Sequence, residues 1–493
     1  MEERREVNYS HILKYTSLFG GIQGIVILIG LIRNKAMALL LTADGMGFNA
    51  LLSSMQNFAV QCTNLGISFS AIPRLSELYE QDNPSQLGYY IQVIRLWSLI
   101  AAALGLVFCV VVSPLVNQMT FSWGDHTLHY AMLGLAVAAV AIAGGETAIL
   151  KATRRLGAIG SAQIFTAAGS VVISIPIYYY WRHSGVVPVI VLVATLNMMV
   201  SVFYSFRCYP YQLRFEWRMV KDGAGMLKLG LAFVLAAAIG SGAELMVRSF
   251  LNVEGGMGDV GLYNAGYMIT VTYAGMVFTA METDYFPRLS AVNKDITATN
   301  ETVNKQMEVS LLFLSPMLVA LLTMLPLLIP MLFTHEFMPV VAMAQLAVLS
   351  MYFKVLTLPV AYITLARGYS MSFLVLETAY FIVFVIAVAL GYTRWGIYGT
   401  GGAIVLAHVF DYLMINAYAY WKYGYRCTGQ IMHYAGVQLT LGALAFSASV
   451  LFEGWAYWTT EAALTLVSTA YSLWVLRQKT RLWESLKRKL LRT

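Results

Sequence analysis

The sequence predicts an all-α integral membrane protein with about fourteen transmembrane helices, because the chain is strongly apolar, sparsely charged and long. Of its 493 residues, 59% are apolar and only 12% are charged, whereas about a quarter of the residues of a soluble domain are charged. The mean hydropathy is +0.66. A bilayer crossing takes about 20 apolar residues, so the spans use almost the whole chain. A soluble globular protein is therefore excluded.

Hydropathy and chain-breaking residues place the helices in order. In the first part of the chain they are expected at 12–41, 46–72, 88–116, 128–150, 157–181, 186–206 and 226–251. In the second part they are expected at 259–286, 306–333, 339–366, 370–392, 397–421, 431–452 and 456–476. The charged segment from Met1 to Lys14 leads into the first span without a small-residue cleavage site, so the first span is expected to be uncleaved.

The placement of basic residues predicts the orientation. An even number of helices puts both termini on one side, and connections that face the cytoplasm should be rich in Lys and Arg. The termini and alternate connections, including Arg74 and Arg95 around the second connection, hold 26 of the 32 Lys and Arg residues. Both termini are therefore predicted to be cytoplasmic, and the net charge of +7 reflects topology instead of nucleic-acid binding.

Short segments recur in one register, which indicates an internal repeat. Pro73-Arg74-Leu75-Ser76 returns 214 residues later as Pro287-Arg288-Leu289-Ser290, Gly47 maps onto Gly261, and Arg33 precedes Arg248 by 215 residues. Such a repeat predicts two pseudo-symmetric six-helix bundles of like orientation, with a site at their interface. The expected domains are an N-terminal bundle at 1–208, a cytoplasmic linker at 209–225, a C-terminal bundle at 226–421, two additional helices at 422–476 and a basic amphipathic tail at 477–493.

The tail at 477–493 places Leu482, Leu486 and Leu490 at helical spacing among basic residues. This pattern suits a helix that lies on anionic lipid of the inner leaflet. A solvated tail that fixes the orientation through its charge is an equally good interpretation.

Charged residues inside the predicted spans are candidates for a binding site, because charges are costly against lipid and usually face a bundle interior or a wet cavity. Arg33 and Lys35 lie in the apolar run of the first span. Arg248 lies in the seventh span, one turn after Glu244. The alternatives are that Arg33 and Lys35 snorkel to the headgroups and that Arg248 merely pairs with Glu244.

A polar stripe runs along the second predicted span. It consists of Ser53, Asn57, Gln61, Asn64 and Ser68, at spacings of four, four, three and four residues. These spacings place all of them on one face of a helix. We expect this face to line a cavity, with hydrogen bonding between helices as the alternative.

Further charged residues are candidates for coupling or gating. Asp284 and Arg288 are one turn apart at the end of the eighth span, Glu282 lies deeper, and Arg74 is the repeat equivalent of Arg288. These residues suggest an inner gate or a topology clamp. Lys354 and Glu377 lie within later spans and form either a buried ion pair or a coupling site.

No catalytic or metal-binding constellation is recognisable. The sequence lacks a P-loop and an H-E-x-x-H motif, and its seven histidines show no metal-ligand spacing. Its cysteines are scattered without a C-x-x-C. A lipid-linked-sugar polymerase or ligase would need a sizeable outer loop, but the predicted outer loops are short and offer only Asp44, Asp125 and His126. We therefore expect a transporter and no enzyme, metal or cofactor.

Several motifs resemble a known family. Gly30-Leu31-Ile32-Arg33-Asn34-Lys35, followed by an apolar run and Asp44-Gly45-Met46-Gly47, is similar to the start of bacterial O-antigen and polysaccharide flippases of the multidrug/oligosaccharidyl-lipid/polysaccharide exporter superfamily. Val260-Gly261-Leu262-Tyr263 and Asp284-Tyr285-Phe286-Pro287-Arg288-Leu289 look like second-half motifs of the same group. The chain departs from the group at Asp44, where a neutral residue is more usual, and Lys35 is not universal in it.

The resemblance implies a flippase of the bacterial cytoplasmic (inner) membrane that moves an undecaprenyl-pyrophosphate-linked O-antigen or polysaccharide repeat unit by alternating access. Arg33, Arg248 and Lys35 would then bind the pyrophosphate, and Arg33 matches an arginine in the cationic cavity of related flippases. Implied partners are anionic membrane lipids and polysaccharide assembly proteins, with no nucleic acid. The energy source stays open between a proton gradient, a sodium gradient and the membrane potential. The alternatives are a cation-coupled multidrug exporter of the same superfamily and a membrane glycan polymerase or ligase.

Overall fold

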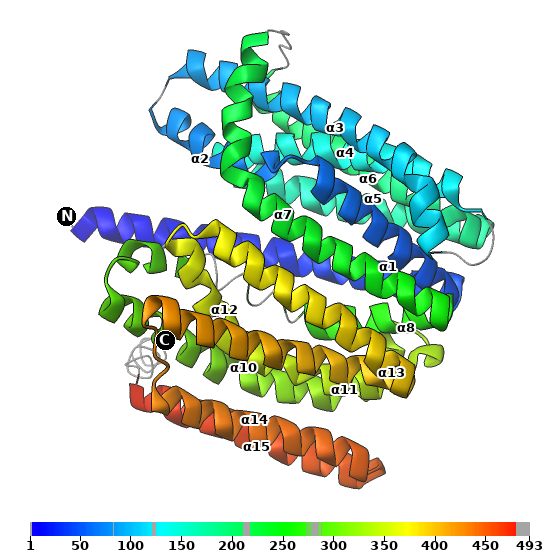
Figure 1. The fold of residues 1–493 in the computed structure, drawn as a ribbon, viewed down its shortest axis with the longest axis vertical. Coiled ribbons are helices and arrows are strands. Elements are labelled where there is room, and N and C mark those ends of the chain that lie inside the picture. The colour runs from blue at the N-terminus through cyan, green and yellow to red at the C-terminus, as the bar shows by residue number, and fades with distance from the viewer. Residues whose placement is uncertain are drawn as a thin grey trace, which may run out of the picture. The chain divides into compact units, whose positions relative to one another are not determined.

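The computed structural model of the chain describes residues 2–81, 83–120, 125–210, 217–273, 275, 278, 285, 286 and 288–479. Of residues 2–20, 68, 69, 225–233 and 479 it describes the backbone alone. Within these ranges the regular structure is helical, without a strand (Figure 1). The predicted all-α fold class is confirmed.

The first of two compact units comprises Met1–Gly261 together with Leu332–Thr334. In chain order its elements are α1 (Glu2–Thr63), α2 (Ile67–Glu80), α3 (Pro84–Thr120), α4 (Thr127–Ala152), α5 (Leu156–Trp181), the 3₁₀ turn η1 (Arg182–Gly185), α6 (Val186–Cys208), α7 (Trp217–Glu254) and the start of α8 (Met257–Tyr267). Helix α4 packs between α3 and α6, and α5 packs against α6 and α1 (Figure 1).

The second unit comprises Leu262–Met331 and His335–Thr493. Its elements are the rest of α8, the π-helical segment η2 (Met268–Tyr273), α10 (Ile296–Leu332), η3 (His335–Phe337), α11 (Val340–Val348), α12 (Ser350–Ala366), α13 (Ser370–Tyr423), α14 (Gly429–Leu451) and α15 (Gly454–Lys479). Helices α11 and α12 pack against α13, and α14 pairs with α15 (Figure 1).

The predicted spans correspond to these helices. Nine helices among the described residues are long and apolar enough to cross a membrane, and the longest of them contain two predicted spans each. Helix α1 is broken at Thr42, where φ is 61°. Helix α13 is broken at Trp395 and Gly396, where φ of the glycine is 58°. Both breaks fall between predicted spans, so the chain is a multi-pass membrane protein of the expected architecture.

The predicted span at 46–72 is wrong at its C-terminal end. Helix α1 ends at Thr63, and α2 begins separately at Ile67. Leu65 and Gly66 between them have φ values of 54° and 70°. Two successive residues in the left-handed region cannot continue an α-helix, and no pattern of polar residues reveals that turn.

Two pairs of residues related by the 214-residue repeat, Ala43 with Met257 and Gly47 with Gly261, lie against each other in the first unit. A Cβ atom on Gly47 would lie 1.9 Å from the carbonyl oxygen of Met257, and one on Gly261 would lie 2.0 Å from that of Ala43. Ala43 and Met257, like Gly47 and Gly261, are 214 positions apart. The N-terminal ends of two repeat-related helices therefore cross reciprocally, so closely that only glycine fits.

A Gly261→Ala substitution is expected to destabilise the protein by about 1–3 kcal/mol, as overpacking does, because the opposing atom is a backbone oxygen that cannot rotate away. Thermal unfolding of the purified protein measures the effect. Gly258→Ala is the matched control, since its Cβ would meet only the carboxylate end of Asp44, at 3.0 Å. Equal melting temperatures for the two variants would contradict the close crossing.

A buried ion pair ties three helices of the first unit together. The Nε of Arg95 on α3 donates to Oε1 of Glu146 on α4 at 2.9 Å, and its Nη2 donates to Oε2 at 3.2 Å. The same guanidinium donates to the carbonyl oxygen of Tyr209, just after α6, at 2.9 Å. Arg95 and Glu146 are only 5% and 4% exposed. Arg95, which the sequence suggests is a topology residue, is thus a structural one.

Candidate functional site

Three of the predicted site cations lie in the first unit. Arg33 is half-buried on α1 and interacts electrostatically with Tyr178 of α5. Lys35, also half-buried, donates a hydrogen bond to the carbonyl oxygen of Phe333, which belongs to the same unit. Arg248 on α7 is 6% exposed.

The predicted Glu244–Arg248 pair is present. An Nη1 atom of Arg248 lies 3.0 Å from Oε2 of Glu244 and 3.3 Å from its carbonyl oxygen. The Glu244 side chain is 38% exposed, whereas that of Arg248 is 8% exposed. The first helices of the two repeats, α1 and α7, thus carry three of these cationic side chains and one carboxylate, that of Glu244.

The structure divides the polar stripe. Ser53, Asn57 and Gln61 lie on the second part of α1, with Asn57 exposed and the other two half-buried. Asn64 follows the end of α1 and continues its hydrogen bonding, because its N–H donates to the carbonyl oxygen of Val60 at 2.8 Å. Ser68 falls on the separate helix α2, and its side chain lies outside the described residues. The stripe is therefore shorter than predicted.

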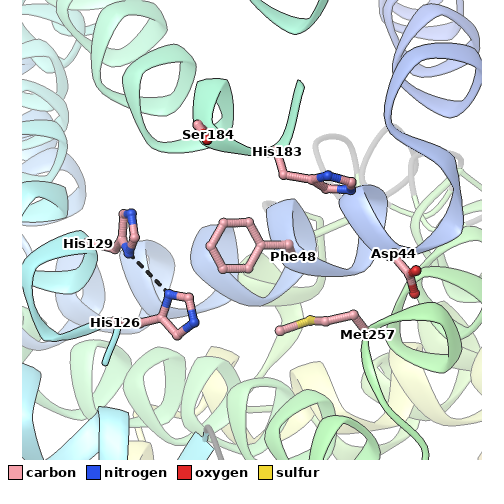
Figure 2. Close-up of a pocket in the computed structure, with 7 residues that line it drawn as sticks. All are labelled: Asp44, Phe48, His126, His129, His183, Ser184 and Met257. Atoms are coloured by element: carbon pink, nitrogen blue, oxygen red, sulfur yellow. Dashed lines mark hydrogen bonds between the residues drawn. The ribbon is translucent and has the colours of Figure 1, made fainter. Parts of the chain in front are cut away.

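The first unit also contains a cavity of about 480 Å³, here called the histidine pocket. Figure 2 shows its lining residues: Asp44, Phe48, His126, His129, His183, Ser184 and Met257. They come from the second part of α1, the start of α4, η1 and the start of α8. Its volume is in the range of small-molecule sites. Asp44 and His126, two of the three residues that the predicted outer loops offer, thus share a pocket.

Two imidazoles in the histidine pocket share one hydrogen. The Nδ1 atoms of His126 and His129 are 3.1 Å apart, so one ring must donate and the other accept. The ring of Phe48 packs on both, with centroid distances of 5.6 and 6.2 Å. Burial lowers the pKa of His126, and the charge of His129 lowers it further, while Asp125 opposes the shift.

Acidification is expected to weaken the fold at this pocket. Since the folded state disfavours protonated His126, the unfolded chain takes up this proton first as the pH falls below about 6.5, and stability is lost. Protonation of the accepting Nδ1 would also break the hydrogen bond between His126 and His129, because both rings would then carry a hydrogen there. The melting temperature of His126→Asn should therefore fall less steeply below pH 6.5 than that of the unsubstituted protein. Parallel pH profiles would contradict this expectation.

The second unit holds a cluster of ionisable groups within its spans. Glu377 and Asp411, on the two parts of α13, both interact electrostatically with Lys354 of α12. The Nζ of Lys354 also lies 5.7 Å from the ring centroid of Phe278. Lys354 therefore interacts electrostatically with two carboxylates, of which the sequence analysis singled out only Glu377.

A tyrosine and a histidine of α13 lie close to this cluster. Tyr380 lies one turn after Glu377, and its ring contacts His408 at a centroid distance of 5.5 Å. The Nδ1 of His408 lies 2.9 Å from the carbonyl oxygen of Ile404. Tyr380 interacts electrostatically with Glu377 and Asp411, and His408 does so with Lys354, so both side chains lie beside the cluster.

Two of the gating candidates are exposed at the surface of their own units. Arg74 on α2 is exposed and pairs with Glu77 at 2.7 Å. Arg288 is exposed, and its Nη2 lies 3.1 Å from Oε1 of Gln306. Glu282 and Asp284 lie outside the described residues. An inner gate that combines these residues stays a prediction.

Sequence reasoning missed Asp411, Glu461 and the pairing of His126 with His129. Asp411 and Glu461 carried a usable signal, since each is an ionisable residue inside a predicted span. The histidine pocket carried none, because η1 and the start of α4 are brought together only by packing.

The fold is shared with solved transporters. The lipid II flippase MurJ in an inward closed conformation is 12% identical, with a TM-score of 0.68, over 94% of this chain and 99% of that chain. A multidrug resistance MATE family transporter of the MOP superfamily, in an inward-facing conformation, is 13% identical, with a TM-score of 0.63, over 86% and 95%. A MOP superfamily transporter from Pyrococcus furiosus is 13% identical, with a TM-score of 0.57, over 88% and 96%. These neighbours are transporters or flippases and not enzymes.

No curated protein matches the chain. The family model of the polysaccharide biosynthesis proteins, however, matches residues 36–342, which is more than half of the sequence. Together with the MurJ-like and MATE-like fold, this match confirms the resemblance inferred from the motifs. The chain belongs to the polysaccharide biosynthesis protein family, with the fold of the MOP transporter superfamily.

Proposed function

We propose that the protein is a flippase that carries an undecaprenyl-pyrophosphate-linked oligosaccharide, an O-antigen or polysaccharide repeat unit, across the bacterial inner membrane. The observation that carries the proposal is the excess of cationic side chains within the spans of the first unit: Arg33, Lys35 and Arg248 against Glu244. Charges at such positions suit a wet, anion-binding cavity. Family membership supports the polysaccharide part, and the MurJ-like fold supports the flippase part.

The chemistry of the cations suits a diphosphate. Guanidinium groups donate several N–H bonds in a planar fork that matches phosphate oxygens, and such charge-assisted bonds are about twice as strong as neutral ones. Glu244 holds the Arg248 side chain in place through one Nη1 atom. Ser53, Asn57 and Gln61 of α1 would face the sugar, while the prenyl chain stays in lipid.

Alternating access then moves the headgroup. Transporters built from two parallel repeats expose a central site first to one side and then to the other by rocking the repeats. Both termini would face the cytoplasm, as the basic residues predict. The tail at 477–493 lies largely outside the described residues, and we propose that it contacts anionic lipid. Polysaccharide assembly proteins would receive the exported unit.

A deletion strain provides the test. Loss of the gene should trap the lipid-linked oligosaccharide on the inner leaflet, where an added glycosidase or a lectin can detect it in inverted vesicles but not in right-side-out ones. Restoration of the gene should reverse the accumulation. If the deletion instead changed glycan chain length without trapping the precursor, a polymerase or ligase would replace the flippase.

The ionisable cluster supplies an energy-coupling proposal. One ammonium group cannot neutralise two carboxylates, so we propose that a bound cation neutralises the second of Glu377 and Asp411, and a proton and sodium both qualify. Glu377→Gln should then retain headgroup binding but lose dependence on the ion gradient in vesicles. If export by Glu377→Gln kept the gradient dependence, the membrane potential acting on the charged headgroup would be the better explanation.

A cation-coupled multidrug exporter is the second candidate, because the same carboxylates would suit it and MATE transporters share the fold. A deletion strain of such an exporter would become sensitive to amphipathic cations without accumulating a glycan precursor. Drug sensitivity and precursor accumulation, measured in one strain, separate the two functions.

A further inference from the structure

A carboxyl group is buried where the helix pair α14/α15 meets the rest of the second unit. Glu461 lies on α15 within the predicted span 456–476 and is 0% exposed. Its Oε2 atom lies 2.9 Å from the hydroxyl oxygen of Thr323 on α10. Its Oε1 atom is buried and has no hydrogen-bond partner. The group differs from the cluster at Lys354, Glu377 and Asp411, whose interactions do not include it.

No positive charge compensates Glu461 among the described residues. The side chains around Glu461 and its hydroxyl partner are Thr323 of α10 and Tyr457 and Thr465 of α15, and Gln345 of α11 donates to the Tyr457 hydroxyl. Only Tyr457 among them is titratable, and its hydroxyl donates to the carbonyl oxygen of Thr323 at 2.7 Å. An ionised carboxylate in such a place would cost several kcal/mol without a paired cation.

The hydrogen count around Thr323 favours a neutral acid. Its hydroxyl oxygen lies 2.9 Å from Oε2 of Glu461, 2.9 Å from the carbonyl oxygen of Val319 and 3.3 Å from the hydroxyl oxygen of Thr465. The hydroxyl has one hydrogen. If Glu461 is protonated, its O–H donates to Thr323, and Thr323 donates to Val319. The hydrogens of Glu461 and Thr323 then both have acceptors. An ionised Glu461 would instead compete with the carbonyl oxygen of Val319 for the single hydroxyl hydrogen of Thr323.

We propose that Glu461 is a proton-binding site that joins α15 to α10. In the described state the carboxyl group carries its proton and donates it in a hydrogen bond to Thr323. Release of the proton would leave a buried charge, and α15 would have to separate from α10 or admit water. The docking of the α14/α15 pair would thus depend on a proton, which goes beyond the proposed cargo and holds whatever the protein exports.

A metal cation fits this place less well. Sodium would need several free oxygen ligands around the carboxylate, but the hydroxyls of Thr323, Thr465 and Tyr457 are already engaged in hydrogen bonds with one another or with backbone carbonyl oxygens. Among the described residues no further Asp, Glu, His or Cys joins Glu461 to make a metal-binding group. The proton is therefore the ligand that we assign.

Gln438 on α14 shows what a purely structural group looks like in the same helix pair. It is 0% exposed. Its Oε1 accepts from the hydroxyl of Ser468 at 2.7 Å, and its Nε2 donates to the hydroxyl oxygen of Ser472 at 2.8 Å. An amide thus satisfies its polar atoms between α14 and α15. Glu461 leaves an oxygen unpartnered and can ionise, so it is suited to titration.

Infrared spectroscopy of the full-length protein in lipid bilayers tests the assignment. At neutral pH the spectrum should contain the carbonyl stretch of a buried protonated carboxylic acid, which Glu461→Gln removes. Glu453→Gln, at an exposed position just before α15, is the matched control and should leave the band unchanged. Replacing sodium with choline should not alter it. No difference between the unsubstituted protein and Glu461→Gln, or a band that responds to sodium, would overturn the proposal.

Alkaline pH gives a second, independent readout. Because the unfolded chain gives up the Glu461 proton above the ordinary glutamate pKa of about 4.3 whereas the folded protein keeps it, the melting temperature of the unsubstituted protein should fall as the pH rises through neutral to alkaline values. Glu461→Gln cannot ionise there and should lose that part of the pH dependence while remaining folded. If both proteins lose stability equally, the proton does not control the docking, whatever the export assay shows.

Discussion

An Arg248→Ala variant is expected to accumulate normally in the membrane yet fail to export the lipid-linked oligosaccharide. Loss of a hydrogen-bonded charge costs about 1.5–3 kcal/mol, which corresponds to about tenfold to a hundredfold weaker binding. The fold should survive, because the partner Glu244 is 38% exposed at its side chain and can be solvated. Inner-leaflet precursor in the complemented deletion strain measures the effect, and Arg33→Ala should behave alike.

Glu244→Gln separates a ligand role from a structural one. If Arg248 serves only to pair with Glu244, removal of either charge should have the same effect. If Arg248 binds the pyrophosphate, Glu244→Gln should export far better than Arg248→Ala. Arg248→Lys should fall between them, because an ammonium keeps the charge but loses the bidentate fork. Full export by both alanine variants would remove Arg33 and Arg248 from the site.

Arg95→Ala is expected to destabilise the protein by about 3–5 kcal/mol, the usual cost of leaving one member of a buried ion pair without its partner. Glu146 would remain 4% exposed with no guanidinium, and the carbonyl oxygen of Tyr209 would lose its donor. Thermal or denaturant unfolding in detergent measures the loss. A joint replacement of Arg95 and Glu146 by apolar residues should recover much of it.

Arg74→Ala is the control for this prediction. Arg74 also pairs with a glutamate, Glu77, but the two side chains are 54% and 53% exposed. Exposed pairs contribute about 0–1 kcal/mol, so this variant should unfold nearly as the unsubstituted protein does. Similar losses for Arg74→Ala and Arg95→Ala would mean that burial is not what makes the Arg95–Glu146 pair important.

Much of the fold could be predicted from the sequence, because membrane spans are local. Hydropathy and chain-breaking residues together located most of the helices and the breaks near Thr42 and Gly396. The end of α1 was missed, since the left-handed turn at Leu65 and Gly66 has no hydropathy signal. The sequence showed that Gly47 and Gly261 occupy equivalent positions of the repeat, but not that they are in contact.

The candidate site was less predictable, because the partners of a charge are chosen by packing. The i, i+4 spacing of Glu244 and Arg248 was enough to foresee their ion pair. Nothing in the sequence paired Arg95 with Glu146 or Glu461 with Thr323, since each contact joins separate helices. Arg95 consequently looked like a topology residue although it is buried.

The amino-acid sequence by itself determined that this protein is a multi-pass helical membrane protein with an internal repeat, because the cost of placing polar groups in lipid acts on each segment independently of the others. Only the tertiary structure decided which charges on separate helices are paired, where the histidine pocket forms and that Glu461 is buried without a counter-charge among the residues that the structure describes. Those features depend on distances between side chains far apart in the chain, which helix packing sets.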